Sequence, residues 1–113
     1  MSKTEAKIEF ILEMIENINF IVKRHKSITN ALCDIEGQMA ILMAIAQIGE
    51  TLKKLDNSII KEYDLVEDKE GAYYTRNYIV HDYEGVDLGF IDNIIREYIP
   101  RLKEKILKIK DKN

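Results

Sequence analysis

The stretch Met39-Ala40-Ile41-Leu42-Met43-Ala44-Ile45-Ala46 decides the fold class, because every one of its residues is apolar. On either side, apolar residues recur at spacings of three and four, as they do along one side of an α-helix. This pattern predicts a helix over residues 28–55, about 40 Å long at roughly 1.5 Å per residue. A helix that is apolar on all sides must be covered by more than one neighbour, either in the same chain or in a second copy.

The composition agrees with an all-α fold. The 113 residues include five Gly and one Pro, too few for the many turns of a β-sandwich or barrel. One Cys excludes an internal disulfide, and no Cys/His spacing matches a zinc site. No run approaches the roughly 18 to 20 apolar residues that span a bilayer, and residues 1–8 lack the apolar core of a signal peptide. We therefore expect a cytoplasmic protein in which residues 1–113 form a single domain.

The segments around the long helix predict further helices. An apolar stripe over residues 8–22 is followed by the basic run 23–26, which suits the negative end of a helix dipole. Residues 58–63 predict a short helical turn, and residues 64–71 predict an acidic loop.

The C-terminal half continues the same pattern. A helix is expected from about Gly71 to Val80 and should end near Gly85, while Asp87 is a suitable N-cap for the last helix. Pro100 falls inside that last helix and should bend it. Short connections between these segments predict an antiparallel helical bundle of four to five helices.

The net charge of −3 is unevenly distributed. Acidic residues gather in 62–70 and 82–92, whereas the last segment carries a series of basic residues. Such a series is typically a solvated helix face, but it can also guide a polyanion toward a site. The basic residues are Arg101, Lys103, Lys105, Lys108, Lys110 and Lys112.

Chemistry concentrates in residues 76–83, Arg-Asn-Tyr-Ile-Val-His-Asp-Tyr. On a helix Asn77 and His81 share a face, while Arg76 and His81 are about 140° apart and can both line only a broad groove, such as one between two protomers. A guanidinium binds phosphate and an imidazole moves protons near neutral pH, so this pair could cleave RNA without a metal. By spacing alone, a surface Arg–Asp pair with a His capping the helix end is the more common arrangement.

The segment Arg76-Asn77-x-x-x-His81-x-Tyr83 resembles the RNxxxHxY signature of HEPN-domain proteins, specifically of the HepT-like toxin family. Ile48-Gly49-Glu50 resembles the family's IGE element, and Tyr83 to Asp87 resembles its Y-x-x-V-D continuation. Pro100-x-Leu102 matches its P-x-L element, so the resemblance extends over about the whole chain. The chain has no Trp, and Tyr73 and Phe90 stand where the family often carries one.

The resemblance implies an all-helical HEPN bundle that forms a homodimer with the signature residues of both copies facing one cleft. It implies a metal-independent endoribonuclease, the toxin of a toxin–antitoxin pair, with RNA as substrate and no cofactor. Its partner would be an MNT-type nucleotidyltransferase antitoxin that silences it by transferring AMP to Tyr83. Arg76 and His81 would be catalytic, with Asn77 positioning them and Glu50 orienting Arg76.

Other residues have simpler interpretations. His25 is expected to be a solvated capping residue at a helix end, and Cys33, Met39 and Met43 are expected to lie in the core.

The main alternative is a non-catalytic module that binds a nucleotide or a partner and acts with a nucleotidyltransferase. The net acidity of the chain favours this alternative, because nucleic-acid enzymes are usually basic. Lys and Arg around the signature cleft would instead favour RNA.

Overall fold

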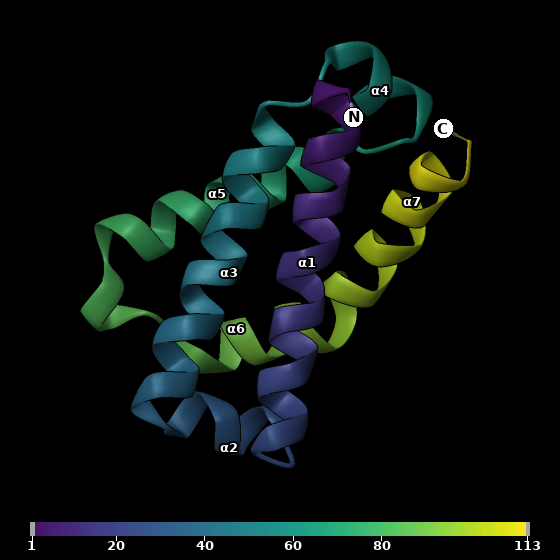
Figure 1. The fold of residues 1–113 in the computed structure, drawn as a ribbon. Helices are drawn as coiled ribbons and strands as arrows, with labels where there is room; N and C mark the ends of the chain where they lie inside the picture. The colour runs from purple at the N-terminus through teal and green to yellow at the C-terminus, as the bar shows by residue number, and fades with distance from the viewer. Residues whose placement is uncertain (1, 113) are drawn as a thin grey trace.

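The computed structural model describes residues 2–112, and within that range every regular element is helical (Figure 1). The long units are α1 (Lys3–Arg24), α3 (Ile35–Lys53), α5 (Val66–His81) and a continuous C-terminal helical rod. The rod consists of α6 (Leu88–Asn93), the π-helical η2 (Ile94–Tyr98) and α7 (Ile99–Lys112). Shorter elements are α2 (Ile28–Cys33), α4 (Asn57–Glu62) and the 3-10 turn η1 (Tyr83–Gly85). The predicted all-α bundle is confirmed.

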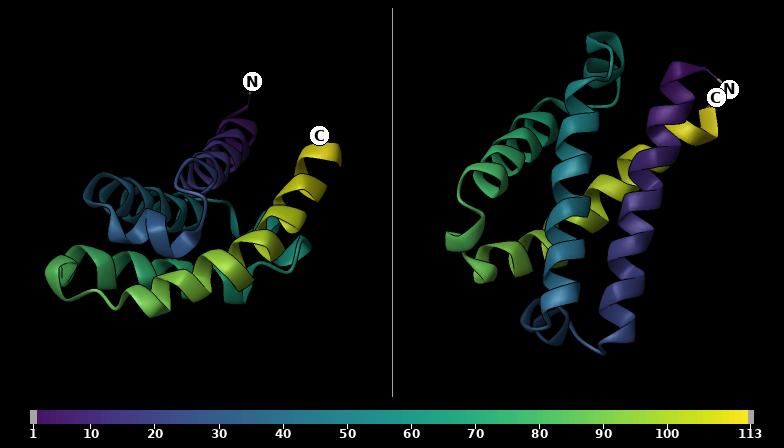
Figure 2. Two further views of the ribbon diagram at one scale, coloured as in Figure 1. Left: turned by 90° about the horizontal axis from the view of Figure 1, so that it is seen from below. Right: turned by 60° about the vertical axis from the view of Figure 1, so that its left-hand side comes forward.

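Helix α3 lies at the centre of this bundle. It packs against α1 on one side and α5 on the other, while the C-terminal rod crosses the bundle diagonally (Figure 2). Most of its apolar residues are buried, as their position on a doubly covered helix requires. Met39 and Met43 are 53% and 59% exposed, because they lie on the side of α3 that the described chain leaves uncovered. The prediction that both lie in the core is therefore wrong.

The predicted continuous helix over residues 28–55 is also wrong, because Asp34 divides it into α2 and α3. The backbone of Asp34 is extended, and its carboxylate accepts a 2.8 Å hydrogen bond from the Gly37 amide at the start of α3. An Asp that caps the next helix competes with continuation of the preceding one. Gly37 lies so close to the Ala31 carbonyl that a side chain there would collide with it.

Two further predictions near this break need correction. Cys33, expected in the core, is exposed at the end of α2. His25 does cap α1, but it is only partly exposed rather than fully solvated. Its Nδ1 lies 2.9 Å from the Ile21 carbonyl oxygen and its Nε2 lies 3.3 Å from the Asp34 carboxylate, so it links the end of α1 to the cap of α3.

The acidic segment 64–71 was expected to be a loop, but α5 begins within it, at Val66. Glu67 and Asp68 occupy the first turn of α5, where negative side chains are favoured by the exposed amides and the helix dipole. The acidic residues that interrupt the apolar pattern therefore stabilise the start of α5 and do not keep this segment out of a helix.

The C-terminal rod continues through Pro100, as predicted. Pro100 has no amide hydrogen, and its ring would collide with a carbonyl four residues earlier in a regular α-helix. The preceding turn is widened into a π-helix, in which the Ile99 amide bonds to the Ile94 carbonyl five residues back. Among residues 2–112, no helix is both long and apolar enough to cross a membrane.

Candidate functional site

The signature residues lie at the end of α5 and in η1, beside a cavity of about 390 Å³ between α3 and α5. We call it the signature cavity. One wall is the exposed side of α3 and the other is the last two turns of α5 with η1. Its lining residues are Met39, Met43, Ala46, Gln47, Glu50, Arg76, Ile79, Val80 and Tyr83.

Arg76 contacts Glu50 and Asn77, and its guanidinium also lies over the Tyr73 ring, 5.7 Å from the ring centre. Its Nε lies 3.0 Å from Glu50 Oε2, and its Nη1 donates a 2.8 Å hydrogen bond to Asn77 Oδ1. The side chains of Arg76 and Glu50 are both about one-third exposed, so solvent screens this ion pair only in part. The predicted contact of Glu50 with Arg76 is present, and Asn77 also reaches the guanidinium.

Gly49 makes this contact possible. A Cβ on Gly49 would collide with the Ala72 carbonyl oxygen, so the backbones of α3 and α5 are in direct contact there. The neighbouring Glu50 is thereby brought within reach of Arg76 across the two helices. The predicted role of Gly49 in close helix approach is confirmed.

Glu50 keeps an unused hydrogen-bonding position. Its Oε2 is buried and accepts no hydrogen bond from the residues that the structure describes, since the Arg76 contact is an ion pair without an aligned N–H. The positive charge of Arg76, whose Nε is 3.0 Å away, offsets part of the cost of burying this carboxylate oxygen.

His81 and Tyr83 are placed differently. His81 is the last residue of α5 and is exposed, but it does not line the signature cavity, and residues 2–112 provide its side chain with no hydrogen bond or ion pair. Tyr83 follows in η1, lines the cavity and is 42% exposed. A single copy therefore brings Glu50, Arg76 and Tyr83 to one cavity without His81.

Sequence reasoning missed Tyr78, which holds the loop that carries Tyr83. Its hydroxyl accepts a 2.7 Å hydrogen bond from the Asp87 amide and lies 3.5 Å from the Gly85 carbonyl oxygen. Its ring meets Phe90 edge to face at 5.9 Å. The only sequence signal for this role of Tyr78 was its position within the signature, as the first of the three x residues between Asn77 and His81.

No group of three or more His, Cys, Asp or Glu side chains in residues 2–112 is arranged to hold a metal ion. The polar groups that the signature places at or beside the cavity are a guanidinium, a carboxylate, an amide, a phenol and an imidazole. This set can bind a phosphate group and exchange protons with it.

The all-α bundle and the segment Arg76–Tyr83 are what the resemblance to the HepT-like family predicts, and comparison with known proteins agrees. The family model "Ribonuclease HepT-like" matches residues 11–109. The chain therefore belongs to the HepT-like ribonuclease family.

Individual relatives match over most of their length. "Probable ribonuclease HepT" of Thermococcus cleftensis is 32% identical over 91% of this chain and 92% of its own. "Putative RNase MJ1380" of Methanocaldococcus jannaschii is 26% identical over 94% and 97%, respectively.

A longer relative matches only in part. "Gamma-glutamylcyclotransferase and putative RNase MJ0434" of the same organism is 39% identical over 64% of this chain, a match that spans 32% of that protein. No solved structure matches the chain.

Proposed function

We propose that this protein is a metal-independent endoribonuclease and the toxin of a HEPN/MNT toxin–antitoxin pair. The observation that supports this most is Arg76, held by Glu50 and Asn77 at a cavity in a chain of a ribonuclease family. A guanidinium fixed in this way is prepared to bind a phosphate without further reorganisation.

The proposed reaction is attack by the ribose 2′-oxygen on the adjacent phosphorus. One His81 imidazole removes the 2′-hydroxyl proton while the new oxygen–phosphorus bond forms. The bond between phosphorus and the 5′-oxygen breaks as a protonated imidazole donates its proton to that oxygen. The products are a 2′,3′-cyclic phosphate and a 5′-hydroxyl. Arg76 stabilises the charge that develops on the non-bridging phosphate oxygens.

A second copy of the chain would complete this site. Within one copy, His81 lies outside the signature cavity that holds Arg76. The exposed apolar side chains beside Arg76 would be buried by a homodimer that places the two signature segments face to face. These side chains are Met39, Met43, Val80 and Tyr83.

Silencing would occur at Tyr83. Its phenol, 42% exposed at the edge of the cavity, is accessible to an MNT-type nucleotidyltransferase. The phenolate would attack the α-phosphorus of ATP and release pyrophosphate. The resulting AMP group would place a negative charge beside Arg76 and occupy the space for the RNA phosphate.

The decisive experiment is cleavage of a fluorescent single-stranded oligoribonucleotide by the full chain in excess EDTA. We expect cleavage by the unaltered chain and a loss of about 10²- to 10⁴-fold in His81→Ala, the range for removal of a general acid–base group. Glu84→Ala, which changes an exposed neighbour, is the matched control and should remain active. Both variants should elute as dimers.

If His81→Ala and Arg76→Ala both cleave at the unaltered rate, catalysis by this site is wrong. If the unaltered chain binds RNA or a nucleotide without cleaving, the non-catalytic binding module is the better description. Complete inhibition by EDTA would contradict metal independence.

The silencing step is tested by intact mass after co-expression with the cognate nucleotidyltransferase. We expect mass added in whole AMP units, absent in Tyr83→Phe and retained in Tyr74→Phe, which alters an exposed tyrosine of α5 outside the signature cavity. Unchanged mass beside a demonstrably active transferase would contradict AMP transfer.

A further inference from the structure

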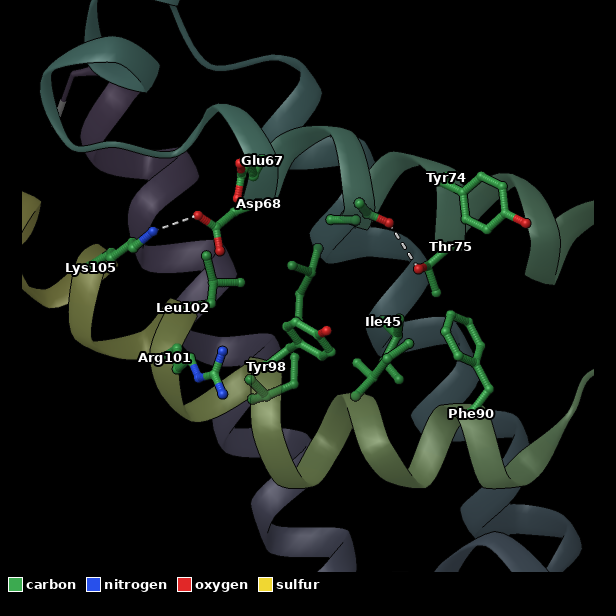
Figure 3. A pocket seen from close by; sticks show the side chains of 15 residues that line it. Ile45, Glu67, Asp68, Tyr74, Thr75, Phe90, Tyr98, Arg101, Leu102 and Lys105 are labelled. Carbon is green, nitrogen blue, oxygen red and sulfur yellow. Dashed lines mark hydrogen bonds and ion pairs between the residues drawn. The ribbon is translucent and has the colours of Figure 1, made fainter.

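A second cavity, of about 490 Å³, lies on the other side of α5, between this helix and the C-terminal rod (Figure 3). Three aromatic side chains reach it from different segments: Tyr74 from α5, Phe90 from α6 and Tyr98 from η2. They are 68%, 37% and 54% exposed, respectively. We call this space the aromatic cavity, and Ile45 and Ile48 of α3 form part of its apolar lining.

The π-helix places one of these rings. Tyr98 is the last residue of η2, and the wider turn there is the one that precedes Pro100. Exposed single aromatic residues are common on protein surfaces, but three around one apolar hollow form a surface on which a planar group can stack.

Basic residues of α7 separate into two stripes. Lys103 and Lys110 lie on the side toward α1, where Lys103 pairs with Glu16 at 2.9 Å and Lys110 pairs with Glu9 at 3.1 Å. These two lysines therefore serve the bundle itself.

The other four basic residues lie on the side of α7 that faces away from α1. At roughly 100° per residue around the helix axis, they lie within about 60° of one another. We call them the basic stripe, and the two nearest to η2 line the aromatic cavity. Lys108 and Lys112 are exposed and form no ion pair with any residue in 2–112. The stripe consists of Arg101, Lys105, Lys108 and Lys112.

The four charges of the basic stripe differ in availability. Lys105 is bound to Asp68 at 2.8 Å and to the Asp64 carbonyl oxygen at 2.8 Å, and the Asp68 carboxylate raises its pKa. The Arg101 guanidinium lies over the Tyr98 ring, and two-thirds of the Arg101 side chain is exposed. Its ion pair with Glu97 is long, with 3.8 Å between Nη2 and Oε2. Arg101, Lys108 and Lys112 are thus the cations that a ligand can use.

We propose that an unpaired base of an RNA chain stacks on the rings of the aromatic cavity while its phosphates follow the basic stripe. Aromatic rings next to a line of cations are the combination by which proteins hold single-stranded nucleic acid. The inference rests on the proposed function, because it supplies a second contact for the same RNA on a different side of α5 from the signature cavity.

The aromatic and apolar lining favours RNA over an acidic peptide, since cations alone would attract either polyanion. The apolar part of the cavity suits a flat base, which its ribose joins to the phosphate chain, and an acidic side chain would not fill it. Glu67 also lines the cavity and opposes an anion there. Replacing it by Gln should therefore tighten RNA binding, by about twofold for an exposed charge.

The test is binding of a fluorescent oligouridylate to the full chain carrying His81→Ala, which prevents turnover. Added Tyr98→Ala should weaken binding about tenfold, within the range for loss of one base–aromatic stack. Its control is Phe20→Ala, which removes a ring that is 65% exposed on α1, outside the cavity. Duplex RNA should bind more weakly than the single strand, because its bases are already stacked.

A second variant tests the basic stripe independently of the cavity. Lys108→Gln with Lys112→Gln should reduce the slope of log affinity against log salt by about 0.7 per lost phosphate contact. Lys23→Gln with Lys61→Gln changes the net charge equally at two other helix ends and should leave the slope unchanged.

The inference is overturned if oligouridylate does not bind, or if Tyr98→Ala and the lysine pair both bind it as the parent chain does. Stronger binding of an oligoglutamate peptide than of RNA would also overturn it. The proposed function is judged separately, by cleavage with His81 intact. Binding at this surface without any cleavage would support the inference and contradict the proposed function.

Discussion

The two sides of α5 carry surfaces of opposite character. On one side Arg76 is fixed by an ion pair to Glu50 and a hydrogen bond to Asn77. On the other side the aromatic cavity has exposed rings and a cation, Arg101, that is loosely paired. Fixed charges suit chemistry, in which groups must be placed before reaction, whereas exposed rings suit binding of a chain whose sequence varies.

A short element of α3 serves both surfaces. Ile48 lines the aromatic cavity, Glu50 lines the signature cavity, and Gly49 between them contacts the backbone of α5. The IGE element is therefore the point at which the two sides of α5 are connected, and changes there affect both.

The largest expected difference between the two sides comes from their arginines. Arg76→Ala should lower the cleavage rate by about 10²- to 10³-fold, as expected for loss of a group that stabilises transition-state charge. Arg101→Ala should weaken RNA binding by less than tenfold and leave the maximal rate unchanged, because Arg101 would contact only the flanking strand. Rates at saturating RNA separate these effects. Equal losses of maximal rate in the two variants would contradict the division of roles.

The connection between the two sides is tested by a pair of glycines. Gly49→Ala should destabilise the fold by about 1–3 kcal/mol, because its Cβ forces α3 and α5 apart. Gly71→Ala has open space around the new methyl group and should stabilise the fold by about 0.4–1 kcal/mol, chiefly through the unfolded chain. Urea unfolding measures both, and the same sign for the two would contradict the close-contact argument.

A smaller effect is expected for Glu50→Gln, which keeps the shape of the side chain but removes its charge. Since the ion pair with Arg76 is partly exposed, we expect cleavage to fall about two- to fivefold. Binding of oligouridylate at the aromatic cavity should not change. If neither cleavage nor RNA binding changes, Glu50 does not orient Arg76.

The smallest effect is expected away from both cavities, at Asp34. The Gly37 amide, helped by His25, holds the pKa of the Asp34 carboxyl below its ordinary 3.8. Its contribution to stability is therefore present above the unfolded pKa and is lost as pH falls through the lower folded pKa. Asp34→Asn keeps a capping oxygen that does not titrate. Thermal unfolding in acid should show a steeper loss for the unaltered chain, and parallel curves would contradict this.

Sequence alone could predict what depends on spacing along one helix. The three-four rhythm gives the helical units, and the positions of Arg76, Asn77 and Tyr83 bring their side chains to one end of α5. It could not predict the break at Asp34. The local pattern does not reveal the free-energy difference between a new helix capped by Asp34 and continuation of the preceding helix. The start of α5 within the acidic segment was missed for a similar reason, since the same charges stabilise a helix start or a loop.

The sequence by itself determined the all-α class, the need for several neighbours around the apolar stretch 39–46, and the resemblance to the family, because helical periodicity and the signature spacing are local properties of the chain. The tertiary structure decided that Met39 and Met43 are exposed, that His81 lies outside the cavity that holds Arg76, and that rings from α5, α6 and η2 surround one cavity. These depend on how separate helices approach each other. That approach is set by the fit of their surfaces, such as the missing side chain of Gly49, and not by the periodicity of any single helix.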